Sequence, residues 1–299
     1  MPANGTGSGC IVMAGLNELK THIESVKSTQ KITRAMHLIS ASRSKKARRQ
    51  LESAVIYFRR IAVTLSEILA GSHGLTSPYL TPPRHAPAKG LYIVLAGDKG
   101  MAGGYNHNII KLMDERIDKN ASDVWVAGLA GRAAIARRGY NVEKTFSYPV
   151  VDPSVYRVRE IAEMIVDRYR AGEYGHVHLV YTVMESQLKQ TPTMATLLPL
   201  KPEELLEPGA SFEHINLIKY EPSPEAIFDH MVPFYLKGVL YGAFVEAFAC
   251  EQQARMYAMD NASKSADDMI ASLSLSYNRA RQAIITQEIN EIVGGIPAD

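Results

Sequence analysis

Small and apolar residues recur in steps of three and four along the carboxyl-terminal part of the chain, which contains no proline after Pro233 until Pro297. Starting from Met256, these steps reach Met259, Ser263, Ala266, Ile270, Leu273, Tyr277, Ala280, Ile284 and Gln287. This is the 3.5-residue period of a left-handed coiled coil. A lone helix cannot bury such a stripe, so the pattern predicts a second long helix to pair with it.

The amino-terminal part of the chain carries a matching pattern. Between residues 14 and 70 there is no proline and a single glycine, Gly15. The spacing is mostly three and four residues, and it predicts a shift of register near Gln30. The apolar positions are Leu16, Leu19, Ile23, Val26, Ile32, Met36, Ile39, Leu51, Val55, Phe58, Ala62 and Leu65. We predict that a helix over 14–72 pairs antiparallel with one over 222–295 in the same chain.

Local signals and charge agree with this hairpin. Ser223 and Pro224 form a favourable start for the second helix, and Pro233 inside it predicts a kink or a delayed start. Residues 14–70 carry eleven Lys and Arg against four Glu, whereas residues 222–294 carry five basic and nine acidic side chains. Opposite net charges favour pairing of the two helices, although each exposed ion pair contributes little.

The middle of the chain alternates between strand and helix patterns. An apolar run at 91–96 reads as a buried strand, followed by a glycine-rich turn at Gly97–Gly104 and a helix at 105–117. This alternation predicts a mostly parallel, Rossmann-like α/β domain over 88–221 between the two coiled-coil helices. Further strands are predicted at 124–127, 177–184, 193–198 and 214–220, and helices at 132–138 and 156–170. Residues 1–13 are rich in Gly and Ser and are predicted to form a flexible tail.

Composition excludes several classes of protein. The two cysteines, Cys10 and Cys250, lie far apart, which excludes a disulfide framework and a cysteine zinc site. His176 and His178 would share one face of a strand, but no further ligand lies beside them, so no metal site is predicted. No apolar run reaches the ~20 residues of a membrane span, and the first residues lack the features of a signal peptide.

Two motifs invite a functional interpretation. The turn at Gly97–Gly104 resembles a nucleotide-binding G-x-G-x-x-G motif only loosely and lacks a Gly-Lys-Ser/Thr ending, so a tight turn that needs glycine is the favoured interpretation. Five of the seven residues in Arg43–Arg49 are basic, which is compatible with nucleic acid, an anionic membrane, an acidic protein loop or a solvated helix face. No aromatic residue is interleaved with this run, so nucleic acid ranks low. The sequence offers no nucleophile with a base beside it, and no catalytic residue is predicted.

Three segments together resemble one known family. They are LKTHIESVKSTQKITRAMHLISASR near the amino terminus, GDKGMAGGYN in the middle, and ARMYAMDNASKSADDMI with LSYNRARQAIITQEINEIVGG near the carboxyl terminus. In this order and spacing they resemble the gamma subunit of F-type ATP synthases, of the bacterial type without the chloroplast redox insert. The resemblance covers residues 14–295. Where many members have Leu-Cys in SDRGLCGG, this chain has Met101 and Ala102, which argues against a thiol role there.

The resemblance implies a non-catalytic subunit without a cofactor or metal. Family members form the central rotary stalk, which couples ion flow through the membrane c ring to ATP synthesis or hydrolysis in the hexamer of alpha and beta subunits. The implied partners are that hexamer, the epsilon subunit and the polar loops of the c ring, with one copy per complex, no nucleic acid and no insertion into the membrane. The implied location is peripheral, on the cytoplasmic face of the bacterial plasma membrane. A nucleotide-binding enzyme using Gly97–Gly104 and a coiled-coil adaptor remain as alternatives.

The same resemblance implies partner-binding residues. In QKITRAM, Lys31, Thr33, Arg34 and Met36 match positions near an acidic loop of the beta subunit. Solvated charge is the alternative for Lys31 and Arg34, and coiled-coil packing is the alternative for Met36. The other matching positions are Arg281 and Gln282, which bond the beta subunit in the family, Thr286 and Glu288 beyond them, Arg255, which is implicated in energy coupling or else in packing, and Tyr220 at the foot of the stalk near the c ring.

Overall fold

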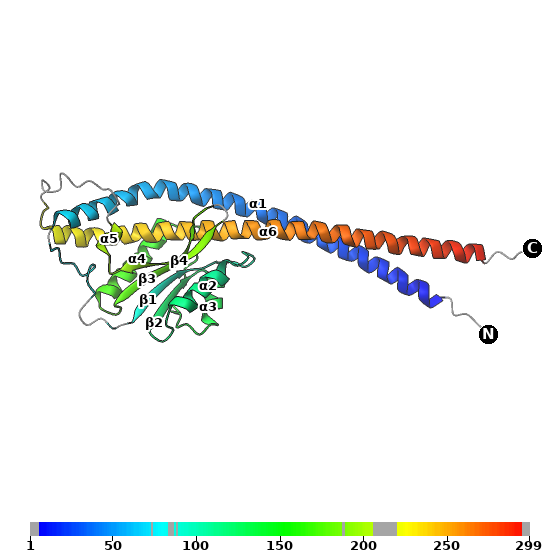
Figure 1. The fold of residues 1–299 in the computed structure, drawn as a ribbon, viewed down its shortest axis with the longest axis horizontal. Helices are drawn as coiled ribbons and strands as arrows, with labels where there is room; N and C mark the ends of the chain where they lie inside the picture. The colour runs from blue at the N-terminus through cyan, green and yellow to red at the C-terminus, as the bar shows by residue number, and fades with distance from the viewer. Residues whose placement is uncertain are drawn as a thin grey trace, which may run out of the picture. The chain divides into compact units, whose positions relative to one another are not determined.

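The computed structural model describes residues 6–72, 74–82, 87, 89–186, 189–205 and 220–294. The chain divides into two compact units. We call Ser40–Arg255 the domain unit, and Met1–Ile39 with Met256–Asp299 the paired-helix unit. Helix α1 (Thr6–Gly71) and helix α6 (Pro224–Gly294) each contribute residues to both units (Figure 1).

The domain unit contains one four-stranded sheet. Strand β1 (Gly90–Leu95) lies in the middle and runs parallel to β2 (Ser122–Ala127) on one side and to β3 (His176–Met184) on the other. Strand β4 (Gln190–Leu198) closes the order β2-β1-β3-β4 by pairing antiparallel with β3. The predicted α/β domain with a mostly parallel sheet is therefore confirmed. The shorter helices are α2 (Tyr105–Arg116), α3 (Leu129–Ala136), α4 (Val155–Arg170) and α5 (Pro202–Leu205).

Each face of the sheet carries its own apolar core, because side chains alternate along a strand. Ile93 and Leu95 of β1 belong to a core that also contains buried residues of α1, α4 and α6. Val94, one residue along, belongs to a second core that contains buried residues of α2 and α3. Cys250 of α6 also lies in this second core. Helix α6 therefore contributes to both cores of the domain.

One stripe of α6 is fully buried in the first core. Phe228, Val232, Leu236, Leu240 and Phe244 follow one another at four-residue spacing, and none is more than 1% exposed. By length and composition α6 could cross a membrane, with a mean hydropathy of 1.2 over its most apolar 18-residue window, yet 56% of that window is buried inside the structure. A place in a protein core accounts for such apolar character.

The start of α6 agrees with the sequence. Pro224 is the first helical residue, and the hydroxyl of Ser223 accepts a hydrogen bond of 3.2 Å from the N–H of Ala226. The helix continues through Pro233, so the alternative of a delayed start is wrong. A proline inside a helix costs about 3 kcal/mol, and burial of the neighbouring Val232 and Leu236 offsets that cost.

In the paired-helix unit, α1 and α6 run antiparallel. The hydroxyl groups of Thr33 and Ser263 lie 2.7 Å apart, and the side-chain amide of Gln30 bonds the carboxylate of Asp267. A step forward on α1 is thus a step backward on α6. The predicted seam of α6 is confirmed from Met259 to Ile284, because each of its positions is buried or half-buried while most residues between them are exposed, whereas Gln287 is exposed. The left-handed winding stays a prediction.

The predicted shift of register near Gln30 is wrong. The less exposed positions of α1 continue in unbroken steps of three and four: Leu16, Leu19, Ile23, Val26, Gln30, Thr33 and His37. The polar side chains of Gln30 and Thr33 are buried and bonded across the pair, which satisfies their hydrogen-bonding groups. The apolar residues that suggested the shift lie outside the seam, since Ile32 is 61% exposed and Ile39 is 52% exposed.

Two further predictions differ from the structure. Helix α1 begins at Thr6, so residues 6–13, predicted as part of a flexible tail, are helical. Extending a helix costs much less than starting one, which allows weak helix formers such as Gly7 and Gly9 to be included. The strand predicted at 214–220 lies outside the described residues except for Tyr220, which is not in a strand.

Candidate functional site

The turn at Gly97–Gly104 is tied to its surroundings through its backbone. The N–H of Gly97 donates to Oδ1 of Asn106 over 2.7 Å, and its carbonyl accepts from the N–H of Gly131 over 2.9 Å. Met101 and Gly103 have φ angles of 60° and 57°, in the left-handed region that favours glycine. The turn is therefore a fixed corner between β1 and α2, as the favoured interpretation of its glycines predicts.

A buried carboxylate from α6 accepts hydrogen bonds from backbone N–H groups of this turn. Glu251 has no exposed surface, and its two oxygens accept from the N–H groups of Asp98 and Lys99, both over 3.4 Å. Burial raises the pKa of Glu251, and the neighbouring Arg255 opposes that shift. In a nucleotide-binding turn the corresponding N–H groups would hold phosphate. Here a protein anion holds that place, so the geometry gives no support to nucleotide binding at Gly97–Gly104.

Arg255 completes this contact from one turn further along α6. Its side chain is 5% exposed, and its guanidinium bonds the Glu251 carboxylate. It also donates to the carbonyl of Lys99 over 3.2 Å and to that of Gly100 over 3.3 Å. The residue predicted to bind a partner is thus engaged within its own chain. Removing one member of a buried ion pair costs about 3–5 kcal/mol, because the other charge loses its partner.

Three more hydrogen bonds join the same stretch of α6 to the domain. The hydroxyl of Tyr105 donates to the carbonyl of Ala247 over 3.1 Å. The N–H of Met184 donates to the carboxylate of Glu246 over 3.0 Å, and the side-chain amide of Gln190 donates to the carbonyl of Cys250 over 3.2 Å. We call the contributing α6 residues the α6 clamp: Glu246, Ala247, Cys250, Glu251 and Arg255. The clamp bonds the glycine-rich turn, the start of α2, the end of β3 and the start of β4.

Asp98 connects the glycine-rich turn to two further segments of the domain, at Leu129 and Val151. Its carboxylate accepts from the N–H of Val151 over 2.6 Å and from the N–H of Leu129 over 3.2 Å. The acidic side chain of the GDKG motif therefore orders two neighbouring segments. Neither Glu251 nor Asp98 is among the site residues predicted from the sequence. The pairing of Glu251 and Arg255 at four-residue spacing beside an apolar run is the signal that could have found the clamp.

The four predicted residues of QKITRAM are placed differently from one another. Thr33 is buried against the partner helix, and Met36 is half-buried. Arg34 pairs with Asp267 over 3.0 Å, with both side chains more than half exposed, so the pair contributes about 0–1 kcal/mol. Lys31 is exposed. Of the four, Lys31 and Arg34 are therefore the ones whose charge faces solvent.

The predicted residues near the end of α6 form an exposed surface. Arg281, Gln282, Thr286 and Glu288 are all exposed, and the Thr286 hydroxyl donates to the carbonyl of Gln282 over 2.9 Å. Large apolar side chains are exposed along the same stretch: Leu275, Ile285, Ile289 and Val293. We call these eight residues the α6 end surface. Exposed apolar side chains mixed with polar ones are typical of a protein-binding surface.

Tyr220 and the two neighbouring histidines have ordinary structural surroundings. Tyr220 is half-buried against the first apolar core, and burial followed by the charge of Glu67 raises the pKa of its phenol. His178 stacks on Tyr92 with ring centres 5.0 Å apart. Burial, together with the charge of His176, lowers the pKa of His178. Within the described residues no group of three or more metal-ligating side chains comes together.

Comparison with known proteins shows which family has this architecture. The family model described as ATP synthase matches residues 15–298. The ATP synthase gamma chain of Ruminiclostridium cellulolyticum is 46% identical over 288 residues, which cover 95% of this chain and 98% of that protein. The chain belongs to the ATP synthase gamma chain family. A second gamma chain of this family, from Acetivibrio thermocellus, is 45% identical over 96% of this chain and 99% of its own length.

Solved structures agree on the fold of the gamma chain. A chain in the structure of the Euglena gracilis mitochondrial ATP synthase, OSCP/F1/c-ring, superposes with a TM-score of 0.64 at 15% identity, over 94% of this chain and 93% of that chain. A chain of the Tetrahymena thermophila mitochondrial ATP synthase central stalk and c ring gives a TM-score of 0.55 at 22% identity, over 78% of this chain and 99% of that chain. At these identities the fold is what the chains share.

Proposed function

We propose that this gamma chain is the central rotary stalk of an F-type ATP synthase. It turns inside a hexamer of alpha and beta subunits and couples ion flow through the membrane c ring to ATP synthesis or hydrolysis. The observation that carries the proposal is α6, a single helix over Pro224–Gly294 that is clamped to the domain by buried polar bonds and ends in an exposed surface. A part that transmits torque needs such a fixed attachment in one stretch and a binding surface in another.

The proposed subunit is non-catalytic, and the chemistry belongs to its partners. Support comes from the use of its buried charges, because Glu251, Arg255 and Asp98 are bonded to one another or to backbone groups. Glu251 and Arg255 are also 0% and 4% exposed, so a substrate in solvent does not reach them. One copy per complex would contact the three beta subunits differently and bias each toward a different conformation.

We assign the predicted partner contacts as follows. On the α6 end surface, Arg281 and Gln282 bond a beta subunit, with Thr286 and Glu288 further along. Lys31 and Arg34 lie near an acidic loop of the beta subunit. The domain meets the epsilon subunit and, close to Tyr220, the polar loops of the c ring. In the cell the complex is peripheral, on the cytoplasmic face of the bacterial plasma membrane.

Reconstitution tests this proposal. The chain is mixed with the alpha and beta subunits of the same organism, and magnesium-dependent ATP hydrolysis is measured in the purified assembly. We expect one copy of this chain per hexamer and activity well above that of alpha and beta alone. The gamma chain of Ruminiclostridium cellulolyticum with its own alpha and beta subunits serves as the positive control. Failure of this chain to co-purify with partners shown to be competent would overturn the proposal.

A further inference from the structure

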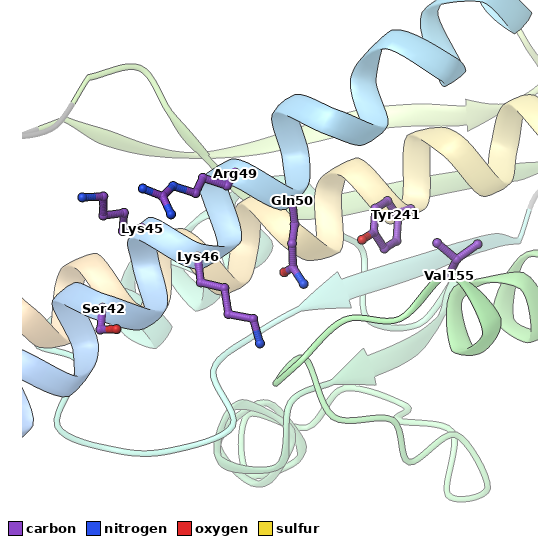
Figure 2. Close-up of a pocket in the computed structure, with 7 residues that line it drawn as sticks. All are labelled: Ser42, Lys45, Lys46, Arg49, Gln50, Val155 and Tyr241. Carbon is purple, nitrogen blue, oxygen red and sulfur yellow. The ribbon is translucent and has the colours of Figure 1, made fainter.

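A pocket of about 670 Å³ lies in the domain unit beside the basic run of α1. Its lining residues, shown in Figure 2, are Ser42, Lys45, Lys46, Arg49, Gln50, Val155 and Tyr241. Five come from α1, and the other two are the first residue of α4 and a residue of α6. The clamp, the paired-helix unit and the α6 end surface contribute none of these residues, so the pocket is separate from the sites described above.

Packing of α1 leaves its basic side chains on the exposed side of the helix, where they line this pocket. Ala47 has no exposed surface and Ser44 is 3% exposed, and the Ser44 hydroxyl donates to the side chain of Gln253 on α6 over 3.2 Å. These contacts fix the rotation of α1. Because the helix repeats every 3.6 residues, Lys45 and Arg49 form one row and Lys46 and Gln50 the next, as Figure 2 shows.

Most of the lining residues carry a hydrogen-bond donor on the side chain. Lys45, Lys46 and Arg49 carry positive charge, and Ser42 and Gln50 add neutral donors. The Nζ of Lys46 lies 3.9 Å from Oδ1 of Asp152, and the two side chains are 69% and 75% exposed. An ion pair this exposed contributes about 0–1 kcal/mol to stability. A pair this weak yields readily to a ligand with more charge.

We propose that this pocket binds an oligophosphate group, either inorganic pyrophosphate or the phosphate tail of a nucleoside diphosphate or triphosphate. Phosphate oxygens are acceptors only and match a wall of Lys, Arg, hydroxyl and amide donors. The volume falls within the roughly 300–1,000 Å³ of small-molecule sites. Tyr241 is only 7% exposed, so its ring offers no face on which a base could stack. Recognition therefore rests on the phosphates.

Binding of an oligophosphate to the purified full-length chain does not depend on the rotary function. Only a regulatory effect rests on the proposed function: an oligophosphate bound to the stalk would let nucleotide or pyrophosphate levels act on the assembled enzyme. Isothermal titration calorimetry at low ionic strength, with pyrophosphate, ATP and AMP as separate probes, tests it without any partner subunit. A failed titration would leave the rotary proposal untouched, and a failed reconstitution would leave this one untouched.

The decisive variant removes three charges from the pocket: Lys45→Ala, Lys46→Ala and Arg49→Ala. The matched control removes three exposed charges elsewhere: Lys20→Ala, Lys27→Ala and Lys111→Ala. We expect pyrophosphate and ATP to bind the wild type at one site, and AMP to bind at least tenfold more weakly. The pocket variant should lose at least tenfold in affinity for pyrophosphate, while the control stays within about twofold. Circular dichroism checks that both variants remain folded.

Several results would overturn the proposal. One is the absence of pyrophosphate and ATP binding to the wild type at low salt. Another is an equal loss in both triple variants, which would mean diffuse attraction to net charge. Equal affinity for AMP and ATP would contradict recognition of linked phosphates. Displacement of pyrophosphate by an equimolar poly-glutamate peptide would assign the pocket to an acidic protein segment instead.

Discussion

Thr33 and Ser263 meet through their hydroxyl groups, 2.7 Å apart, at a buried position where α1 and α6 pair. Most positions of a coiled-coil seam are apolar, and a polar pair there fixes the register at some cost in stability. The Ser263 hydroxyl also donates to the carbonyl of Met259 over 2.8 Å. The two side chains thus form a hydrogen-bonded polar pair within the seam.

Replacing Thr33 removes the hydrogen bond between the two helices, while the Ser263 hydroxyl keeps its bond to the Met259 carbonyl. We expect Thr33→Val alone to lower the free energy of unfolding by about 0.5–1.5 kcal/mol. The double variant with Ser263→Ala should recover much of that loss, because both groups become apolar. Chemical denaturation followed by helicity measures all four members of the cycle. Additive losses in the double variant would mean that the two hydroxyl groups do not interact.

Breaking the buried ion pair of the clamp should destabilise the domain unit strongly. Arg255→Ala leaves the Glu251 carboxylate buried without its cation, and we expect a loss of about 3–5 kcal/mol in the free energy of unfolding. Arg281→Ala, an exposed arginine on the same helix, is the control and should stay within about 0.5 kcal/mol. Urea denaturation of the full chain compares them. Equal stability of the two variants would show that the clamp contributes little.

Charge placed in the seam should separate the paired helices. Ile270→Asp with Leu273→Asp puts two carboxylates at half-buried seam positions, and an unpaired buried charge is costly. We expect lower helicity and a lower melting temperature. The control is Met269→Asp with Leu275→Asp, which changes neighbouring side chains that are 47% and 54% exposed. Similar melting of both double variants would argue against pairing through this seam.

The α6 end surface should matter for coupling rather than for folding. We expect Arg281→Ala or Gln282→Ala to lower ion pumping per ATP hydrolysed in the assembled complex, while the isolated chain melts as the wild type does. Both side chains are exposed, so their removal leaves the core unchanged. Pumping and hydrolysis are measured together in membrane vesicles. Wild-type values for both variants would remove these residues from the proposed interface.

Stability of the domain should depend on Asp123 at low pH. Its carboxylate accepts from Lys89 over 2.7 Å, Tyr174 over 2.9 Å and Asn141 over 2.7 Å. Burial alone would raise the pKa of Asp123, but these hydrogen bonds and the charge of Lys89 outweigh it and lower the pKa. A lowered pKa in the folded state means that the stabilisation is present above the unfolded value of 3.8 and is lost as the pH falls through the folded value.

The matching variant is Asp123→Asn, which we expect to cost about 1–2 kcal/mol at neutral pH. Its free energy of unfolding should fall less steeply than that of the wild type as the pH drops below about 4. Asp268→Asn, at an exposed carboxylate, serves as the control for loss of one negative charge. Parallel pH profiles for Asp123→Asn and the wild type would contradict the assignment.

Much of the fold follows from the periodicity of apolar residues, and the wrong predictions about the paired helices share a physical cause. The stripe from Met259 to Ile284 and the apolar run of β1 are read directly from the spacing of apolar residues. The register of α1 is misread because Ile32 and Ile39 are apolar but exposed, whereas Gln30 is polar but buried. Spacing alone cannot reveal that a polar side chain finds a hydrogen-bond partner on a distant helix.

The candidate site shows the same division. Arg281 and Gln282 are identified by resemblance, and the structure leaves them exposed, as a partner contact requires. Arg255 is identified as well, but the carbonyls of the glycine-rich turn that its side chain bonds belong to residues about 150 positions away in the chain. Such contacts depend on how β1 and α6 pack, which no local pattern encodes.

The clamp also fixes the angular position of α6 relative to the sheet. Its bonds come from the glycine-rich turn, α2, β3 and β4 and converge on residues Glu246–Arg255. A slip by one residue would turn the helix by about 100° and break them all together. Within the domain unit the clamp therefore sets both the position of α6 along its axis and its rotation about that axis.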